Sequence, residues 1–582
     1  MPDSQNPNEI QQRPGGHGGI VGKKKARTKP KGRMVDPAAI DEVKDILGTA
    51  PDQRDMLIEY LHLIQDNQGY LSQRHLTALA QMMKLPMAEV WEVATFYDHF
   101  DCIKDGETPP APVTIRVCES LSCQLAGAER LLAELEAIDG SDVRIKRAPC
   151  IGACDKAPAA ALGQQLIPNA DKAVIENVLA NGAPTPASAE ATLFEDYTNN
   201  GGYSTLKQIT SGQMTADQVI EKLGETALRG LGGAGFPTSK KWSIVRSFAG
   251  PRIMAVNGDE GEPGTFKDRY YLSRDPHRML EGMLIGAAVV EATDVYIYMR
   301  DEYPEIIALL RDEIAKVEAA GLADHTKIHL RRGAGAYICG EESAMIESIE
   351  GKRGLPRHRP PYVAEVGIFG RPTLVNNLET LFWIRDLLER GGEWFNSQGK
   401  ENHPGFRSYS VSGRVANPGV VVAPAGSTVN ELIAHCGGMA EGHTFKGYLP
   451  GGASGGILPA HKGDIPLDFG GELAEEGCFV GSHAVVVMSD QDNMRDAALN
   501  LLQFFAHESC GQCTPCRNGT EKAVQMLHQP SPDVDLLSQV SATMTDASIC
   551  GLGQAASNPL VSVMKHFPED MDAPLPKLGK KH

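Results

Sequence analysis

The spacing of apolar residues changes several times along this chain of 582 residues, and each change marks a predicted domain. From residue 35 to residue 100, apolar side chains recur every three to four residues, with short polar breaks between the segments. This spacing is typical of amphipathic helices and predicts a small helical bundle with aromatic and methionine side chains in its core. The bundle offers no candidate site. Residues 1–34 before it are rich in Gly, Pro, Lys and Gln, which predicts a disordered tail.

Strand-like alternation begins after the bundle and marks a second domain, residues 101–180. Val113–Cys118 and Val143–Arg147 alternate between apolar and polar residues, and residues 127–138 between them have helical spacing. Two pairs of thiolates on neighbouring loops can hold a [2Fe–2S] cluster, which needs two sulfur ligands per iron. Zinc is the alternative, although zinc sites more often use pairs spaced C-x2-C. The cysteines at or just after the strand ends are Cys118, Cys123, Cys150 and Cys154.

Three further domains are predicted downstream of a linker. Residues 181–199 are rich in Ala, Pro and small polar residues, as linkers are. Residues 200–403 contain a buried strand, Arg252–Asn257, and carry most of the candidate site residues. Residues 404–490 return to strand-like alternation, and residues 491–570 are helical. The whole pattern predicts a multidomain α/β protein.

A glycine-rich stretch, Arg229–Trp242, reads RGLGGAGFPTSKKW. Glycines allow the backbone to pass close to a ligand, and exposed N–H groups at a helix N-terminus form an anion site, most often for phosphate. The segment before the glycines has a helical pattern, so we predict a phosphate loop outside the standard dinucleotide-binding fold. The alternative is a tight glycine turn without a ligand. The glycines concerned are Gly230, Gly232, Gly233 and Gly235.

A second set of cysteines lies in the C-terminal helical region. Three are spaced C-x2-C-x2-C and the fourth is distant, which is strong evidence for a [4Fe–4S] cluster over zinc. Pro515 within the close group is expected to keep this loop from forming a regular helix. The four residues are Cys510, Cys513, Cys516 and Cys550, whereas Cys102, Cys339, Cys436 and Cys478 are read as ordinary or structural thiols.

Charge and hydropathy narrow the class of protein. The formal net charge is −18, which argues against nucleic acid as a partner. No apolar run reaches the length needed to cross a bilayer, so direct membrane insertion is not expected, and the N-terminus lacks the apolar segment of a secretory signal. Cysteines grouped at ligand spacings suit metal binding in a reducing cytoplasm better than disulfides.

Several motifs follow one another in a fixed order: the glycine stretch, Asn257–Gly264 (NGDEGEPG), Gly333–Glu342 (GAGAYICGEE), the pair Asn376 and Asn377, and the C-terminal cysteines. In this order they resemble the FMN- and NADH-binding flavoprotein subunit of respiratory complex I. They equally resemble its relatives in soluble NAD-reducing hydrogenases and NAD-dependent formate dehydrogenases. The resemblance covers roughly residues 200–570. Residues 35–180 resemble the thioredoxin-like [2Fe–2S] subunit of complex I, here fused to the flavoprotein, and residues 404–490 its β-grasp domain.

The resemblance implies a role for individual residues at an FMN and NAD site. Lys241 would pair with the FMN phosphate, Phe236 would stack on an NADH ring, and Glu262 would help hold the nicotinamide nucleotide. Glu342 would lie beside the isoalloxazine, where negative charge lowers the flavin potential, as NAD+ reduction requires. Glu262 and Glu342 are therefore the candidate catalytic residues. The other expected contacts to the cofactors are Asn257, Asp259, Glu260, Gly340, Glu341, Tyr362, Asn376 and Asn377.

Two positions depart from the family pattern at the expected adenine pocket. Ile244 stands where the family has an aromatic residue, and Tyr362 stands where a phenylalanine is expected, so the adenine clamp is looser or differently built. Arg353, Arg357 and Arg359 form a basic run that suits either nucleotide phosphates or a solvated face.

Finer details most resemble the beta (diaphorase) subunit of a soluble NAD-dependent formate dehydrogenase. These details are Arg300–Pro304 (RDEYP), the stretches 450–459 and 465–470, and the fused N-terminal module. The expected partner is a large catalytic subunit with a molybdenum or tungsten pterin cofactor and further iron–sulfur clusters. The alternatives are the diaphorase subunit of an NAD-reducing hydrogenase, a complex I flavoprotein, and an inactive scaffold that keeps the clusters for assembly. The retained glycines, Lys241 and the complete cysteine sets argue against the scaffold.

Overall fold

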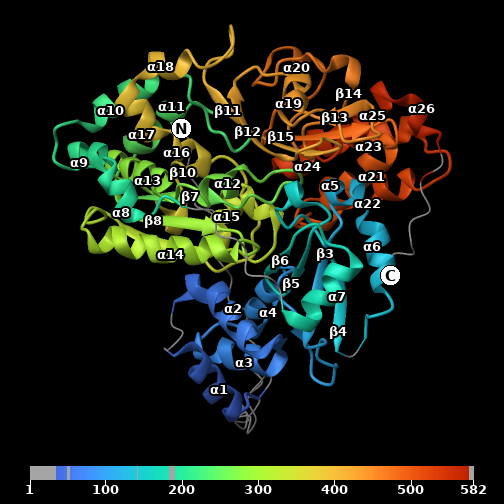
Figure 1. The fold of residues 1–582 in the computed structure, drawn as a ribbon. Coiled ribbons are helices and arrows are strands. Elements are labelled where there is room, and N and C mark those ends of the chain that lie inside the picture. The colour runs from blue at the N-terminus through green and yellow to red at the C-terminus, as the bar shows by residue number, and fades with distance from the viewer. Residues whose placement is uncertain (1–33, 49–52, 141, 183–190, 574, 576–582) are drawn as a thin grey trace, which may run out of the picture.

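The computed structural model describes residues 34–48, 53–140, 142–182, 191–573 and 575. Almost all of the predicted tail and residues 183–190 of the predicted linker lie outside these ranges, and Phe194–Asn199 of that predicted linker form a helix. Figure 1 shows the N-terminal bundle at the bottom and the two C-terminal domains on the upper right. The α/β domain predicted over residues 200–403, called the flavin-type domain below, lies on the left. In the described part of the chain, every helix is too short or too polar to span a membrane.

The N-terminal bundle forms from four helices, as the three- to four-residue spacing predicts. Its core is continuous with apolar residues of the flavin-type domain and of the C-terminal helices. A short parallel pair of strands, β1 (Leu71–Ser72) and β2 (Cys102–Ile103), joins the bundle to the segment that follows it. The helices are α1 (Pro37–Leu47), α2 (Leu57–Gln68), α3 (Gln73–Met82) and α4 (Met87–Ala94).

The second domain is a four-stranded mixed sheet covered by helices α5 (Leu121–Leu125), α6 (Ala128–Leu135) and α7 (Lys172–Asn181). Its two parallel strands, β3 (Val113–Cys118) and β4 (Val143–Ala148), coincide with the predicted strands. The antiparallel strands β5 (Ala160–Leu162) and β6 (Gln165–Ile167) were not predicted, because three residues are too few to show a period.

The flavin-type domain is built on a parallel sheet of order β10-β7-β8-β9, with apolar helix α13 (Pro276–Val290) packed against it. The strands are β7 (Arg252–Gly258), β8 (Ala292–Met299), β9 (Lys327–Arg332) and β10 (Thr373–Asn377). Their register brings all four carboxyl ends to one edge, with Asn377 opposite Asn257 and Met299 opposite Arg332. Ligands of open α/β sheets bind at this edge.

The remaining helices of this domain surround the sheet. The glycine stretch lies between α10 (Ala216–Gly224) and α11 (Thr238–Ser247), so the expected helix–loop–helix arrangement is present. The other helices are α8 (Phe194–Asn199), α9 (Ser204–Thr210), α12 (Lys267–Leu272), α14 (Pro304–Ala319), α15 (Glu342–Ile349), α16 (Leu378–Phe382), α17 (Ile384–Arg390) and α18 (Gly392–Asn396).

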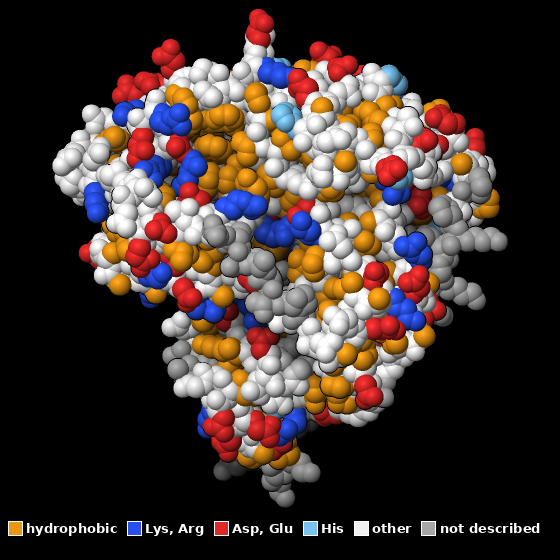
Figure 2. Space-filling model, viewed as in Figure 1, with side chains coloured by type: hydrophobic (Ala, Val, Ile, Leu, Met, Phe, Trp, Pro, Cys, Tyr) orange, Lys and Arg blue, Asp and Glu red, His pale blue; other side chains and the backbone are white. Residues whose placement is uncertain are grey.

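Two smaller domains complete the chain. The first is a five-stranded sheet of order β12-β11-β15-β13-β14 with helices α19 (Val429–His435) and α20 (Gly471–Glu475). Its strands are β11 (Phe406–Gly413), β12 (Gly419–Pro424), β13 (Phe445–Leu449), β14 (Leu458–Pro459) and β15 (Ala484–Ser489). The second is helical, with α21 (Met494–His507), α22 (Thr514–Leu527), α23 (Val534–Ala547), α24 (Gly551–Ala555), α25 (Asn558–His566) and α26 (Pro568–Met571). On the face shown in Figure 2, acidic and basic side chains are interspersed, and apolar side chains gather over β11 and β12.

Candidate functional site

A cavity of about 1110 Å³ lies at the carboxyl ends of β7 and β10. Every residue that the sequence assigned to the FMN and NAD site lines this one cavity, although the residues come from separate stretches of the chain. Arg357 and Arg359 of the basic run also line it, whereas Arg353 turns away and pairs with Glu92 of the bundle. The structure therefore brings the predicted site together and separates Arg353 from it.

The glycine loop forms a cradle in the cavity wall. Arg229 and Pro237, at the two ends of the loop, form an antiparallel backbone bridge, and helix α11 begins directly after Pro237. A Cβ atom on Gly235, whose φ is +63°, would approach the Phe469 ring to 2.7 Å, and a Cβ on Gly232 would approach Asn377 to 2.9 Å. The loop thus needs glycine for close packing, and its backbone is left facing the cavity, as a phosphate loop requires.

The three carboxylates after β7 differ in their hydrogen-bond partners. Both oxygens of Glu260 accept backbone N–H groups at the start of α12, from Asp268 at 2.7 Å and Arg269 at 3.1 Å. Glu262 accepts two hydrogen bonds from Ser454 of the neighbouring domain. Oδ2 of Asp259 has no partner among the described residues. Burial raises the pKa of Asp259 to about 8, which favours the protonated carboxyl at neutral pH.

Lys241 places its ammonium group between the glycine loop and the acidic motif. Its Nζ donates to the Val375 carbonyl at 3.1 Å and lies 3.6 Å from Oε2 of Glu342. Arg359 pairs with the same glutamate at 3.2 Å and also with Glu341. An ammonium has three donors, so Lys241 can still bind an anion, and the acidic charge beside it is largely balanced.

Three apolar side chains on the cavity wall are unusually exposed. Phe236 is 44% exposed, Ile244 is 43% exposed and Tyr362 is 58% exposed. Large apolar surfaces that stay open beside a cavity are suited to planar rings of a ligand. The arrangement fits the predicted nucleotide clamp.

Asn376 and Asn377 are the last residues of β10 but point to different partners. Asn376 is buried, and its Oδ1 accepts the indole N–H of Trp242 at 2.9 Å. Asn377 caps α16 and donates from Nδ2 to Asp268 at 2.8 Å. Both residues fix the wall of the cavity through these bonds.

The first cysteine set is assembled by folding, with its sulfur atoms buried together. Cys150 and Cys154 lie 3.5 Å apart, and the Cys118 thiol interacts with those of Cys123 and Cys150. Cys150 and Cys154 pack on Phe266 of the flavin-type domain. Four buried, mutually contacting thiols form a donor set that fits a [2Fe–2S] cluster facing that domain.

The second cysteine set lies against the cavity. Cys550 lines the cavity directly, and the charge of Cys510 acts on both Cys516 and Cys550. Burial raises the pKa of Cys516 to about 11 and that of Cys550 to about 12. These thiols stay protonated at neutral pH unless a metal displaces the protons, which is how cluster ligands behave.

The expectation for Pro515 was wrong. Helix α22 begins at Thr514, so Pro515 lies in its first turn and Cys516 lies inside the helix. The first backbone N–H groups of a helix have no intrahelical acceptor, so proline is tolerated there. Pro515 starts the helix that presents Cys516 rather than preventing it.

The sequence singles out Arg300 only as part of a family motif. In the fold, Arg300 connects the loop of Cys150 to the segment of Glu260. It is 3% exposed, and its guanidinium donates to the carbonyl of Cys150 at 2.6 Å and to the carbonyl of Glu260. The hydroxyl of Tyr303 in the same motif donates to Glu260 at 3.1 Å. Arg300 directly follows β8, and residues at that edge of a parallel sheet commonly carry function, which is the signal that could have identified it.

Four family descriptions match the chain in the order of its domains. They are "Thioredoxin-like [2Fe-2S] ferredoxin" over residues 43–183, "Nuo51 FMN-binding domain" over 223–386, "SLBB domain" over 408–458, and "NADH-ubiquinone oxidoreductase-F iron-sulfur binding region" over 496–574. These matches confirm the predicted fold class and the presence of domains that bind FMN, a [2Fe–2S] cluster and a [4Fe–4S] cluster. The ligand residues themselves stay predictions.

Known proteins resemble the chain over most of its length. The second F-type subunit of the NADH-quinone oxidoreductase of Rhizobium meliloti is 38% identical over 410 residues, which is 68% of this chain and 96% of that protein. The mitochondrial NADH dehydrogenase [ubiquinone] flavoprotein 1 of Dictyostelium discoideum is 38% identical over 391 residues, covering 64% and 81% of the two chains. The crystal structure of an NAD+-reducing [NiFe]-hydrogenase in the H2-reduced state has a chain with a TM-score of 0.79. That chain is 31% identical, and the match covers 90% of this chain and 94% of the hydrogenase chain.

Proposed function

Because the chain belongs to the family of F-type subunits of NADH-quinone oxidoreductase, we propose that it is a diaphorase subunit. In this proposal it passes electrons between NAD(H) and its iron–sulfur clusters, with the cavity as the site of FMN and NAD. Bound FMN would supply the exchange between two-electron hydride chemistry and one-electron chemistry.

One observation carries the proposal: the cavity wall contains the loop of Cys550, a ligand of the proposed [4Fe–4S] cluster. A hydride acceptor and a one-electron carrier must lie close together to work in sequence, and this shared wall supports such an arrangement. The proposed [2Fe–2S] cysteines are connected to the cavity residue Glu260 by Arg300. This arginine donates hydrogen bonds to the backbone carbonyls of Cys150 and Glu260.

The residues of the chain contribute position and charge rather than proton transfer. Lys241 and the glycine loop would hold the FMN phosphate, and Asp259 would form a hydrogen bond to the bound molecule through its unpartnered oxygen. Phe236, Ile244 and Tyr362 would hold nucleotide rings on the exposed rim of the cavity. Glu262 and Glu342 would face the reacting rings, with Glu342 held in place by Lys241 and Arg359.

Arg300→Met should lower the reduction potential of the [2Fe–2S] cluster, on the order of tens of millivolts. The reduced cluster carries one more negative charge, and the buried guanidinium beside Cys150 stabilises that charge. A redox titration followed by electron paramagnetic resonance measures the shift. Arg300→Lys is the matched control, because it keeps the charge and loses the forked donor. An unchanged potential in Arg300→Met protein with an intact cluster would contradict this role.

For the electron donor, we propose formate, supplied through a large partner subunit with a molybdenum or tungsten pterin cofactor. The sequence details of Arg300–Pro304 and the fused N-terminal module support this choice. The second candidate is hydrogen, because a single chain of an NAD+-reducing [NiFe]-hydrogenase matches 90% of this chain, fused module included. In either case the subunit would work in the cytoplasm.

The purified subunit alone should oxidise NADH with artificial acceptors and show no activity with formate. Every redox centre proposed for this chain is a flavin or an iron–sulfur cluster, and none of these takes two electrons from the C–H bond of formate. Formate-dependent NAD+ reduction should appear only in the native complex. Elemental analysis of that complex is the deciding measurement. Nickel in place of molybdenum or tungsten, with hydrogen as the donor, would replace the formate assignment and leave the diaphorase assignment intact.

A further inference from the structure

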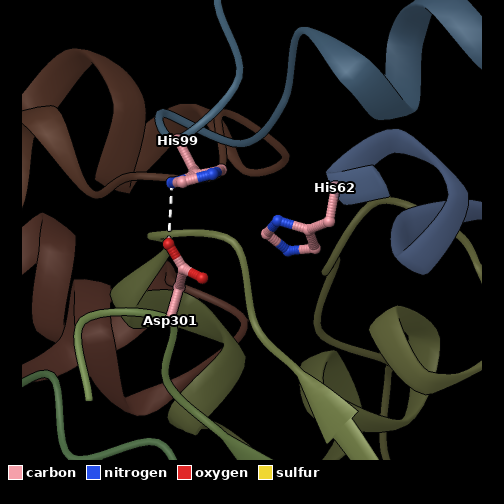
Figure 3. Close-up of side chains that lie close together, drawn as sticks. All are labelled: His62, His99 and Asp301. Carbon is pink, nitrogen blue, oxygen red and sulfur yellow. Dashed lines mark ion pairs between the residues drawn. The ribbon is translucent and has the colours of Figure 1, made fainter. Parts of the chain in front are cut away.

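The bundle and the flavin-type domain meet at a buried cluster of His62, His99 and Asp301, shown in Figure 3. His62 lies in α2 of the bundle, His99 follows α4, and Asp301 follows β8 at the carboxyl edge of the flavin-type sheet. The sequence indicated no site in the bundle, because these residues are far apart along the chain and no spacing connects them. The cluster takes no part in the cavity or in either cysteine set.

His62 has one nitrogen paired and one nitrogen available. Its side chain is buried, with 1% of its surface exposed, and Nε2 lies 2.8 Å from the carbonyl oxygen of Gly333. A carbonyl only accepts, so Nε2 carries the proton and Nδ1 carries a lone pair. Nδ1 has no partner among the described residues. Burial holds the pKa of His62 well below its usual range, which keeps the ring neutral.

His99 also has one paired ring nitrogen and one without a partner among the residues described, with the roles of Nδ1 and Nε2 exchanged relative to His62. Its Nδ1 donates to Oδ2 of Asp301 at 2.8 Å, and its Nε2 is buried without a partner in the described part of the chain. Asp301 also accepts from Gln164 at 2.9 Å and from Arg332, so its oxygens are satisfied and it acts as an anchor. Arg332 forms a second ion pair, between its Nη1 and Oδ2 of Asp66 at 2.6 Å.

We propose that His62 Nδ1 and His99 Nε2 bind one divalent late-transition cation, with zinc as the ion that fits best. Metal-bound histidines almost always donate their other ring N–H to a carbonyl or a carboxylate, and Gly333 and Asp301 serve these two roles here. Imidazole nitrogen suits zinc, which binds at about 2.0–2.1 Å. Water completes the coordination.

The two histidine rings lie close to each other and to Asp301. The ring centroids are 4.9 Å apart, and one ligand atom from each of the three side chains lies within 4.8 Å of the others. The two available nitrogens do not bond to each other. Two buried nitrogens without partners are costly, and one shared cation satisfies both.

Such an ion would join the bundle to the edge of the flavin-type sheet. One ligand comes from α2 and the other from the segment after α4, and both are anchored on the loops that follow β8 and β9. The ion would therefore have a structural role, separate from electron transfer.

The test uses the full chain loaded with FMN and clusters, incubated with zinc chloride alone and then freed of excess metal. Zinc per chain is measured by mass spectrometry, and X-ray absorption at the zinc edge identifies the ligands. We expect one zinc per chain with two imidazole ligands and no sulfur. Absence of stoichiometric zinc, or zinc bound by sulfur, would overturn the proposal.

Two substitutions keep the anchoring bonds and remove only the available nitrogens. In His62→Gln the amide can still donate to Gly333, and in His99→Asn the amide can still donate to Asp301. Each should weaken zinc binding by more than about tenfold, the lower end of what losing even a second-shell partner costs. His329→Gln is the control, because His329 lies on β9 and pairs with Asp294 outside the cluster. FMN and iron contents report folding, and zinc retained by both folded variants would reject the site.

Discussion

Cys513→Ser should remove the electron paramagnetic resonance signal of the [4Fe–4S] cluster almost completely and leave that of the [2Fe–2S] cluster. Cys150→Ser should have the opposite effect. The two ligand sets lie in different domains, and each cluster needs its own four thiolates. Cys513 is the better choice than Cys550, because Cys550 lines the cavity and its loss would also disturb the flavin site. NADH oxidation with an artificial acceptor should continue in both variants.

The matched control for these variants is Cys436→Ser. Cys436 is buried in the core of the five-stranded domain, away from both cysteine sets, so its replacement should leave both signals in place. If Cys513→Ser or Cys150→Ser abolished both signals in a protein that still folds and binds FMN, the assignment of the ligand sets would be wrong.

Lys241→Ala should release FMN. Hydrogen bonds to charged groups contribute roughly 1.5–3 kcal/mol, so the dissociation constant should rise roughly 10- to 100-fold. Flavin per chain after gel filtration and the NADH oxidation rate measure the effect. Lys240→Ala is a close control, because the neighbouring lysine is exposed and lies outside the cavity.

Glu342→Ala should lower the rate of NADH oxidation with an artificial acceptor while both clusters stay in place. In the structure this carboxylate is held by Lys241 at 3.6 Å and by Arg359 at 3.2 Å, so Glu342→Gln separates loss of charge from loss of shape. Normal flavin content and normal rates in both Lys241→Ala and Glu342→Ala would defeat the proposed site.

The motif Arg300–Pro304, whose sequence supports the formate proposal, makes contacts inside this chain. Arg300 and Tyr303 are buried, with Arg300 donating to the carbonyl of Cys150 and Tyr303 donating to the carboxylate of Glu260. Within stretch 450–459, Ser454 bonds to Glu262. The formate proposal rests on the sequence resemblance of the Arg300–Pro304 motif, and the metal of the proposed partner subunit tests it.

Local features could be predicted because they depend on neighbours in the sequence. Strand β3 and the buried part of β7 follow from alternation and apolar runs, and the glycine loop follows from residues that need close backbone packing. Cysteine spacing indicated both ligand sets, since coordination chemistry limits how far apart neighbouring ligands can be. The Pro515 expectation failed because the effect of proline depends on whether it stands in the first turn of a helix or in its middle.

The sequence by itself therefore indicated the fold class, the glycine loop and the two cysteine sets, because period, spacing and residue type are local properties, while FMN and NAD entered through the resemblance to a family. Only the tertiary structure decided which donors meet: Cys550 at the flavin cavity, Arg300 between two loops, and His62 facing His99. These contacts join residues far apart along the chain, and their geometry follows from strand register and from the packing of one domain on another. No periodicity along the chain records that packing.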